Sequence, residues 1–100
     1  MQMVNDRKVL ERELESHFGT ECRRLRLLTL KLHVMYQRGW PDRLVVHNGK
    51  AYFSELKTLI GKQTAFQLMV SAKLEARGFK VPVLRTKQEI TSYLETIANA

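Results

Sequence analysis

The chain has little cysteine and no long apolar run, and each of these shortages excludes a kind of protein. Its one cysteine, Cys22, excludes an internal disulfide and a cysteine-based zinc site, and we expect it to be buried as a small hydrophobe. No apolar stretch approaches the ~20 residues that a membrane-spanning helix needs. Polar and charged residues at positions 5–8 interrupt the first apolar residues, so no secretory signal is predicted. These features predict a cytoplasmic protein without a membrane-spanning segment.

Acidic residues are scarce beyond the N-terminal segment, and the net charge is +7. Residues 23–87 contain fourteen Lys or Arg and only three acids, Asp42, Glu55 and Glu75. Lys and Arg neutralise phosphates and release counterions, so this distribution indicates a polyanion partner. A basic face can also serve solubility alone, and the charge by itself does not separate DNA from RNA or from an anionic membrane surface.

The hydrophobic pattern predicts one compact α/β domain over residues 1–100, with a mixed central sheet and the order α-β-β-β-α-β-α. The elements are expected at about 4–18, 22–34, 43–47, 51–56, 63–77 and 79–84, and from Thr86 onward. Asn5 or Asp6 is the predicted cap of the first helix, and Gly19 its end. Thr86 and Glu89 predict a capping box for the last helix. A domain of this length has a modest core, so pairing with a second copy would help to stabilise it.

Two groups of apolar residues are expected in the core. Alternate residues of the 43–56 segment share one sheet face, which is predicted to pack under the first helix; they are Leu44, Val46, Ala51 and Phe53. The helix at 63–77 carries a stripe at helical spacing, also predicted to be buried, formed by Phe66, Met69, Val70 and Leu74.

The segment from Trp40 to Lys57 predicts a β-hairpin around which the rest is arranged. Two runs rich in β-branched and aromatic residues flank Asn48-Gly49. This dipeptide favours a two-residue type I′ turn, because that turn needs positive φ at both central positions. The turn fixes the register of every pair along the two strands.

This register places three charged residues together at the open end of the hairpin. Asp42 lies opposite Glu55, and Lys57, two residues further on, lies on the same sheet face. Opposed carboxylates repel each other, and Mg²⁺, which is usually held by one or two carboxylates, water and substrate phosphates, would remove the repulsion. A lysine beside the ion could orient an attacking water or stabilise negative charge on the phosphate. An ordinary surface cluster of charged side chains is the alternative.

Three sequence blocks resemble those of the VRR-Nuc domain, a member of the PD-(D/E)xK nuclease superfamily. They are G-W-P-D-R-L at 39–44, E-L-K at 55–57 and the pattern G-K-x-x-x-x-Q at 61–67. The resemblance extends from the first helix to about Ile90. It implies a compact restriction-endonuclease-like core.

The resemblance also implies roles for individual residues. Asp42, Glu55 and the Leu56 carbonyl would hold Mg²⁺ or Mn²⁺, and Lys57 would act on the attacking water. A glutamate of the first helix reaches the metal in the family, and Glu11 matches its place. Glu15 lies one turn along the same face and is the competing choice, while a solvated helix charge is the alternative for each. Gln67 matches a glutamine that contacts the active site.

Five further residues are predicted to contact DNA, because cationic and aromatic side chains near the site can hold phosphates and stack on bases. They are Lys31, Arg38, Trp40, Arg43 and Lys62. Lys31 could instead be an ordinary solvent-facing strand lysine, and Trp40 could equally cover the small core.

Taken together, the resemblance implies a metal-dependent DNA endonuclease. Within the family, the chain most resembles stand-alone proteins of the phage type, which act as homodimers on branched DNA such as four-way (Holliday) junctions. The expected partners are therefore DNA and a second copy, with no membrane, in the cytoplasm of a bacterial host. The alternative is a non-catalytic basic module that binds nucleic acid, and dependence on a divalent metal separates the two.

Overall fold

A computed structural model of the chain describes residues 6–100. The elements are α1 (Asp6–Leu25), β1 (Leu28–Lys31), β2 (Arg43–His47), β3 (Lys50–Leu56), α2 (Ala65–Glu75), β4 (Val83–Leu84) and α3 (Lys87–Ala98). The predicted α/β class and element order are confirmed. The predicted helix start at residue 4 and the cap Asn5 lie outside the described residues. Across residues 6–100, no helix has both the length and the apolar character that crossing a membrane requires.

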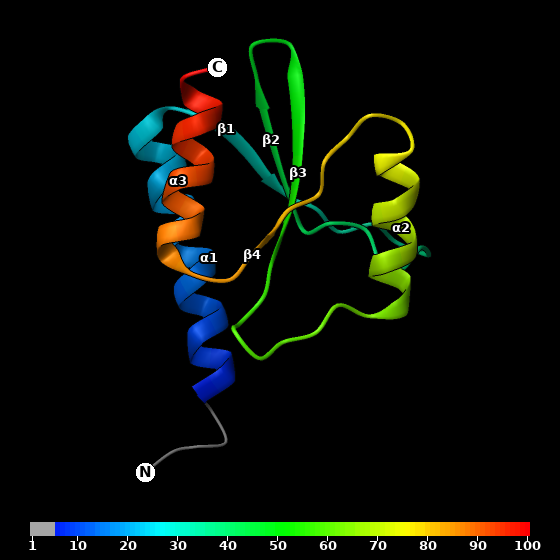
Figure 1. Cartoon of the computed structure of the whole chain (residues 1–100). Coiled ribbons are helices and arrows are strands. Elements are labelled where there is room, and N and C mark those ends of the chain that lie inside the picture. The colour runs from blue at the N-terminus through cyan, green and yellow to red at the C-terminus, as the bar shows by residue number, and fades with distance from the viewer. Residues whose placement is uncertain (1–5) are drawn as a thin grey trace.

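The four strands form one mixed sheet in the order β1-β2-β3-β4, with β3 and β4 parallel and the other pairs antiparallel. The helices α1 and α3 lie side by side against one face of this sheet, and α2 lies on the opposite side (Figure 1). Two helices therefore cover one face, while the other face is only partly covered.

The hairpin forms in the predicted register. Asn48 and Gly49 both have positive φ, of 52° and 75°, as a type I′ turn requires. His47 pairs with Lys50, and the ladder continues to Arg43 opposite Ser54. Because Asp42 precedes β2 directly, it reaches the position opposite Glu55.

The main core lies between α1, α3 and one face of the sheet. Its fully buried members include Phe18, Val45, Ile90 and Leu94. Cys22 is 1% exposed and belongs to the same cluster, as predicted. The apolar spacing of α3 directs one stripe into this core, and the predicted capping box of Thr86 and Glu89 fixes where that helix begins.

The prediction that the face formed by Leu44, Val46, Ala51 and Phe53 packs under α1 was wrong. The opposite face of the hairpin does so: Val45 is fully buried in the main core, and the Arg43 guanidinium lies 5.4 Å from the centroid of the Phe18 ring. Strand alternation determines which residues share a face, but it does not determine which face a helix covers. The carboxylate face is consequently the less covered face of the sheet.

Three predicted boundaries were also wrong. The strand predicted at 79–84 is limited to Val83–Leu84. The first helix does not end at Gly19, because Cys22 continues the buried stripe of Leu14 and Phe18 for another turn. The helix ends only near Arg26, which has a φ of 58°. The first strand is therefore limited to Leu28–Lys31 instead of extending over 22–34.

The helix α2 is only half buried. Val70 and Leu74 point inward, as predicted, but Phe66 and Met69 are 47% and 46% exposed, contrary to prediction. Helical spacing alone does not show how wide a buried stripe is. This helix begins with a capping box in which the Thr64 hydroxyl accepts from the Gln67 N–H and the Gln67 side chain accepts from the Thr64 N–H.

We expect Ile90→Ala to lower the free energy of unfolding by about 2–5 kcal/mol, because it leaves a cavity at a fully buried position between α3 and the sheet. Urea denaturation followed by circular dichroism would measure the loss. Leu59→Ala is the matched control, since Leu59 is 73% exposed and should change stability by no more than about 0.5 kcal/mol. Equal losses in the two variants would contradict the assigned core.

Candidate active site

Asp42 and Glu55 meet at the open end of the hairpin. Pro41, which is buried, leads the chain into β2, and the Asp42 carbonyl continues the β1–β2 ladder by accepting from the Leu32 N–H at 2.9 Å. The Asp42 Oδ1 accepts from the backbone N–H of Leu56 at 3.3 Å, which ties this carboxylate to β3. The pairing of the two strands thus places two acids next to each other, as the register predicted.

Glu55 differs from Asp42 in that its charged side chain is almost completely buried. It is 1% exposed, and its Oε2 accepts from the Gln63 side-chain amide at 2.9 Å. Its other oxygen, Oε1, is buried and has no hydrogen-bond partner among the described residues. A buried carboxylate oxygen without a partner is costly. A bound cation would satisfy it.

The electrostatics of the pair support this interpretation. Burial raises the pKa of Glu55, and the nearby Asp42 charge raises it further, while the Gln63 amide and the Lys57 ammonium lower it. Burial likewise raises the pKa of Asp42, against the hydrogen bond from Leu56. Each carboxylate therefore holds its negative charge less readily than a solvated one, until a positive charge compensates it.

The residues present fit a hard divalent cation. Two carboxylates and the neighbouring Leu56 carbonyl offer oxygen ligands of the kind that Mg²⁺ or Mn²⁺ takes, with water and substrate phosphate completing the shell. Among residues 6–100, no cluster of three or more Asp, Glu, His or Cys side chains could hold a metal. Such a sparse donor set suits an ion held jointly by protein and substrate.

The acids of α1 take different positions. Glu11 is exposed. The Glu15 carboxylate accepts from the Lys31 ammonium at 3.2 Å, and its charge raises the pKa of Asp42. Of the two candidates, Glu15 is therefore the one whose charge acts on Asp42, and it also forms an ion pair with Lys31.

Lys57 follows Glu55 by two residues and is held by the sheet and the loop after it. Its N–H donates to the Leu84 carbonyl at 3.0 Å, in the parallel pairing of β3 and β4. The loop that follows is closed by Arg85, whose Nη1 donates to the carbonyls of Thr58 and Gly61 at 2.6 Å each. Arg85 therefore fixes the backbone that directly follows the predicted catalytic lysine.

Arg85 and Gln63 were not predicted from the sequence. Both act through tertiary contacts that no local spacing predicts. The predicted glutamine, Gln67, uses its side-chain oxygen to cap α2, while the amide that contacts Glu55 belongs to Gln63. The only sequence signal for Gln63 is its place in the short loop between Lys57 and α2.

The residues predicted to contact DNA divide into two groups. Arg38 and Lys62 are exposed, and Trp40 is half buried in the loop that leads into β2. Arg43 is half buried and lies over the Phe18 ring on the α1 face, away from the carboxylate face.

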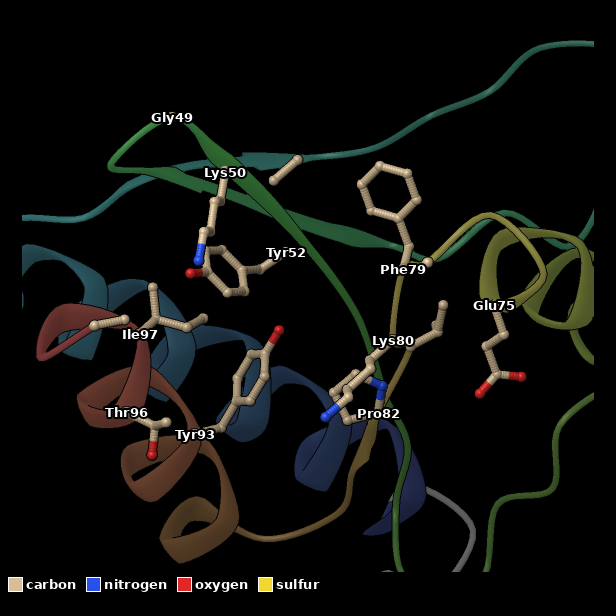
Figure 2. Close-up of a pocket in the computed structure, with 14 residues that line it drawn as sticks. Gly49, Lys50, Tyr52, Glu75, Phe79, Lys80, Pro82, Tyr93, Thr96 and Ile97 are labelled. Carbon is tan, nitrogen blue, oxygen red and sulfur yellow. The ribbon is translucent and has the colours of Figure 1, made fainter.

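A large hollow lies away from the carboxylate pair. It has a volume of about 1160 Å³ and lies between the hairpin, α3 and the segment 78–82 (Figure 2). Tyr52 and Tyr93 contribute to its wall, and Glu75 is the only acid that lines it. Without a second acid it lacks the donor set found at the hairpin end.

Comparison with known proteins identifies the class. No family model matches the chain. A protein of Acyrthosiphon pisum secondary endosymbiont phage 1, p44, which carries the provisional name of a nuclease, is 37% identical over 92 residues, covering 91% of this chain and 98% of that protein. A solved structure described as a VRR_NUC domain has a TM-score of 0.76 at 25% identity, over 85% of this chain and 94% of its own.

The fold is therefore that of a nuclease. The chain belongs to the VRR-Nuc family, as the three sequence blocks predicted.

Replacing Glu55 with Gln tests the cost of the buried charge. Since burial raises the pKa of Glu55 above its ordinary value of 4.5, the folded state releases this proton less readily than the unfolded state. The contribution of Glu55 to the free energy of unfolding therefore falls as the pH rises from 4.5 through the raised pKa. In EDTA at pH 7, Glu55→Gln should unfold at a higher urea concentration than the wild type, and the difference should vanish below about pH 4.

Glu75→Gln is the control, since Glu75 is an exposed acid of α2. It should leave the pH dependence of the urea midpoint unchanged. A wild-type protein that matched Glu55→Gln at both pH values would show that Glu55 is not destabilising when charged.

Proposed function

We propose that the protein is a divalent-metal-dependent endodeoxyribonuclease that hydrolyses phosphodiester bonds. The observation that carries this proposal is the buried Glu55 carboxylate, whose Oε1 has no partner within residues 6–100, beside Asp42 and Lys57. A site built only for stability would pair such an oxygen or replace it with an apolar group. A module that only binds nucleic acid gives no reason for burying two acids within a basic chain.

Each residue has a distinct task in this proposal. Asp42, Glu55 and the Leu56 carbonyl hold Mg²⁺ or Mn²⁺. A glutamate of α1, Glu11 or Glu15, would have to move towards the pair to become a further ligand, because no group of three such side chains lies together among residues 6–100. The ion supplies Lewis-acid activation of the scissile phosphate and a more acidic water.

The remaining groups orient and stabilise. The Lys57 ammonium holds the attacking water and offsets the negative charge that develops on the phosphate. Gln63 keeps the Glu55 carboxylate in one orientation through the 2.9 Å hydrogen bond, and Gln67 assists at the start of α2. Arg38, Trp40, Lys62 and other basic residues hold the DNA backbone.

A second copy of the chain is part of the proposal. One site cuts one strand, so paired cuts at a four-way junction need two sites. The sheet face left uncovered by α2 presents Leu28, Leu30 and Val46, which are 66%, 55% and 41% exposed. Leu28 pairs with Val46 across β1 and β2. An apolar patch of this kind marks an interaction surface, and a homodimer would bury it. The cytoplasm of a bacterial host is the proposed setting.

The first test is cleavage of labelled DNA by variants of the site. Glu55→Gln and Lys57→Met should each reduce cleavage by a factor on the order of 10²–10⁴, because each removes a group that acts on the reacting phosphate. DNA binding, measured by anisotropy in EDTA, should be retained. Cleavage should need Mg²⁺ or Mn²⁺ and should be unchanged in Glu75→Gln.

Undiminished cleavage by Glu55→Gln would contradict the assignment of Glu55 as a metal ligand. Binding without cleavage, by the wild type in either metal, would favour the non-catalytic module instead.

The second test concerns the dimer. Light scattering at micromolar concentration should give twice the monomer mass for the wild type and the monomer mass for Leu30→Glu, because the added charge would be buried in the interface. Leu68→Glu, at a similarly exposed position on α2, should remain dimeric. The dimer should make paired symmetric cuts in a four-way junction, whereas a monomeric wild type would count against this part of the proposal.

A further inference from the structure

A second concave surface lies at the loop that leads into β2, and hydrolysis of the phosphodiester bond does not itself require it. We name it the aromatic groove. It has a volume of about 460 Å³, which is within the range of small-ligand sites. The loop at 36–40, α2 and the residues directly after α2 form it, and the side chains that characterise it are Tyr36, Arg38, Trp40, Phe66, Lys73 and Arg77.

Aromatic rings line this groove in fixed or exposed positions. Trp40 is oriented by a hydrogen bond from its Nε1 to the Gln37 side-chain oxygen at 3.0 Å. The Arg38 guanidinium lies 5.7 Å from the centroid of the Phe66 ring. Tyr36 is 98% exposed and has a φ of 66°, which is costly for a bulky residue. Rings kept out of the core in this way are available to stack on another planar group.

The charge of the groove is of one sign. Arg38, Lys73 and Arg77 line it, and none of its lining residues is acidic. Among the described residues, the salt bridges of the chain involve other side chains, while the Arg77 guanidinium donates to the Lys73 carbonyl at 2.8 Å. An apolar surface bordered by cations alone complements a partner that is planar, apolar and anionic.

The groove is rigidly connected to the two carboxylates. Trp40 precedes Asp42 by two residues, and its ring centroid lies 6.5 Å from that of Phe53, which precedes Glu55 by two residues. At Gly39 the backbone of the loop lies directly against α2, because a Cβ at this position would lie 2.2 Å from the Phe66 carbonyl oxygen. A chain bound in the groove would therefore lead directly to the candidate active site.

We propose that the aromatic groove binds unpaired nucleotides of a single-stranded DNA segment next to the bond that is cut, which rests on the proposed nuclease function. Base stacking on aromatic rings together with phosphate contacts to cations is the combination by which single strands are held. A paired duplex keeps its base faces stacked inside and cannot offer them to Trp40 and Phe66. The groove would thus direct the enzyme to places where a strand leaves the duplex.

Trp40 is the only tryptophan of the chain, so its fluorescence reports directly on the groove. We would titrate the protein in EDTA, which prevents metal-dependent cleavage, with an oligothymidine and with a duplex of equal length. The oligothymidine should quench Trp40 strongly and the duplex only weakly. Phe66→Ala should weaken oligothymidine binding by about tenfold, since a stacked base is lost.

Two controls keep the test specific. Leu68→Ala removes an exposed apolar side chain of the same helix outside the groove and should leave binding unchanged. Arg38→Gln should reduce the slope of log affinity against log salt by about 0.7, the value for one phosphate contact on a single strand.

The outcomes separate this proposal from the nuclease itself. Equal quenching by oligothymidine and duplex, or unchanged binding by Phe66→Ala, would overturn the groove whatever the cleavage assay shows. Trp40 emission that changes with protein concentration in the absence of DNA would also overturn it, because the occupant would then be a second copy. Quenching specific for the single strand in a protein that never cleaves would support the groove while rejecting the nuclease.

Discussion

The structure depends on one electrostatic constraint: two carboxylates are brought together where one of them is shielded from water. The turn at Asn48-Gly49 sets the hairpin register, and that register places Asp42 beside Glu55. Burial and the mutual repulsion of these charges both raise the pKa of Glu55. Proteins bury an uncompensated charge only at a cost of several kcal/mol, so the pair makes physical sense as a site that is complete when a cation is bound.

The two faces of the sheet differ in how far helices cover them. On one face, α1 and α3 enclose the main core, including Phe18, Val45 and Ile90 (Figure 1). The other face carries the carboxylates, is only partly covered by α2, and retains exposed apolar side chains such as Leu30. The stabilising helices α1 and α3 therefore leave this face uncovered at Leu30, although Glu55 itself is almost completely buried.

Local sequence predicted the hairpin, its register and the carboxylate pair, because a turn that needs positive φ has few solutions and register follows from it. The sequence did not predict that α1 passes through Gly19, since the buried contact of Cys22 outweighs the helix-breaking tendency of one glycine. It also could not reveal that Gln63 contacts Glu55 or that Arg85 fastens the loop after Lys57. Those contacts depend on how distant segments meet in three dimensions.

The most direct test of the central claim is anomalous diffraction from crystals grown with Mn²⁺. The account predicts a peak bound by oxygens of Asp42 and Glu55 at about 2.0–2.2 Å, the range for small hard divalent ions, and no peak in Glu55→Gln crystals. Crystals soaked in saturating Mn²⁺ that show no peak there, or a Lys57 ammonium hydrogen-bonded to Glu55 Oε1 in its place, would contradict the claim that this pair is a metal site.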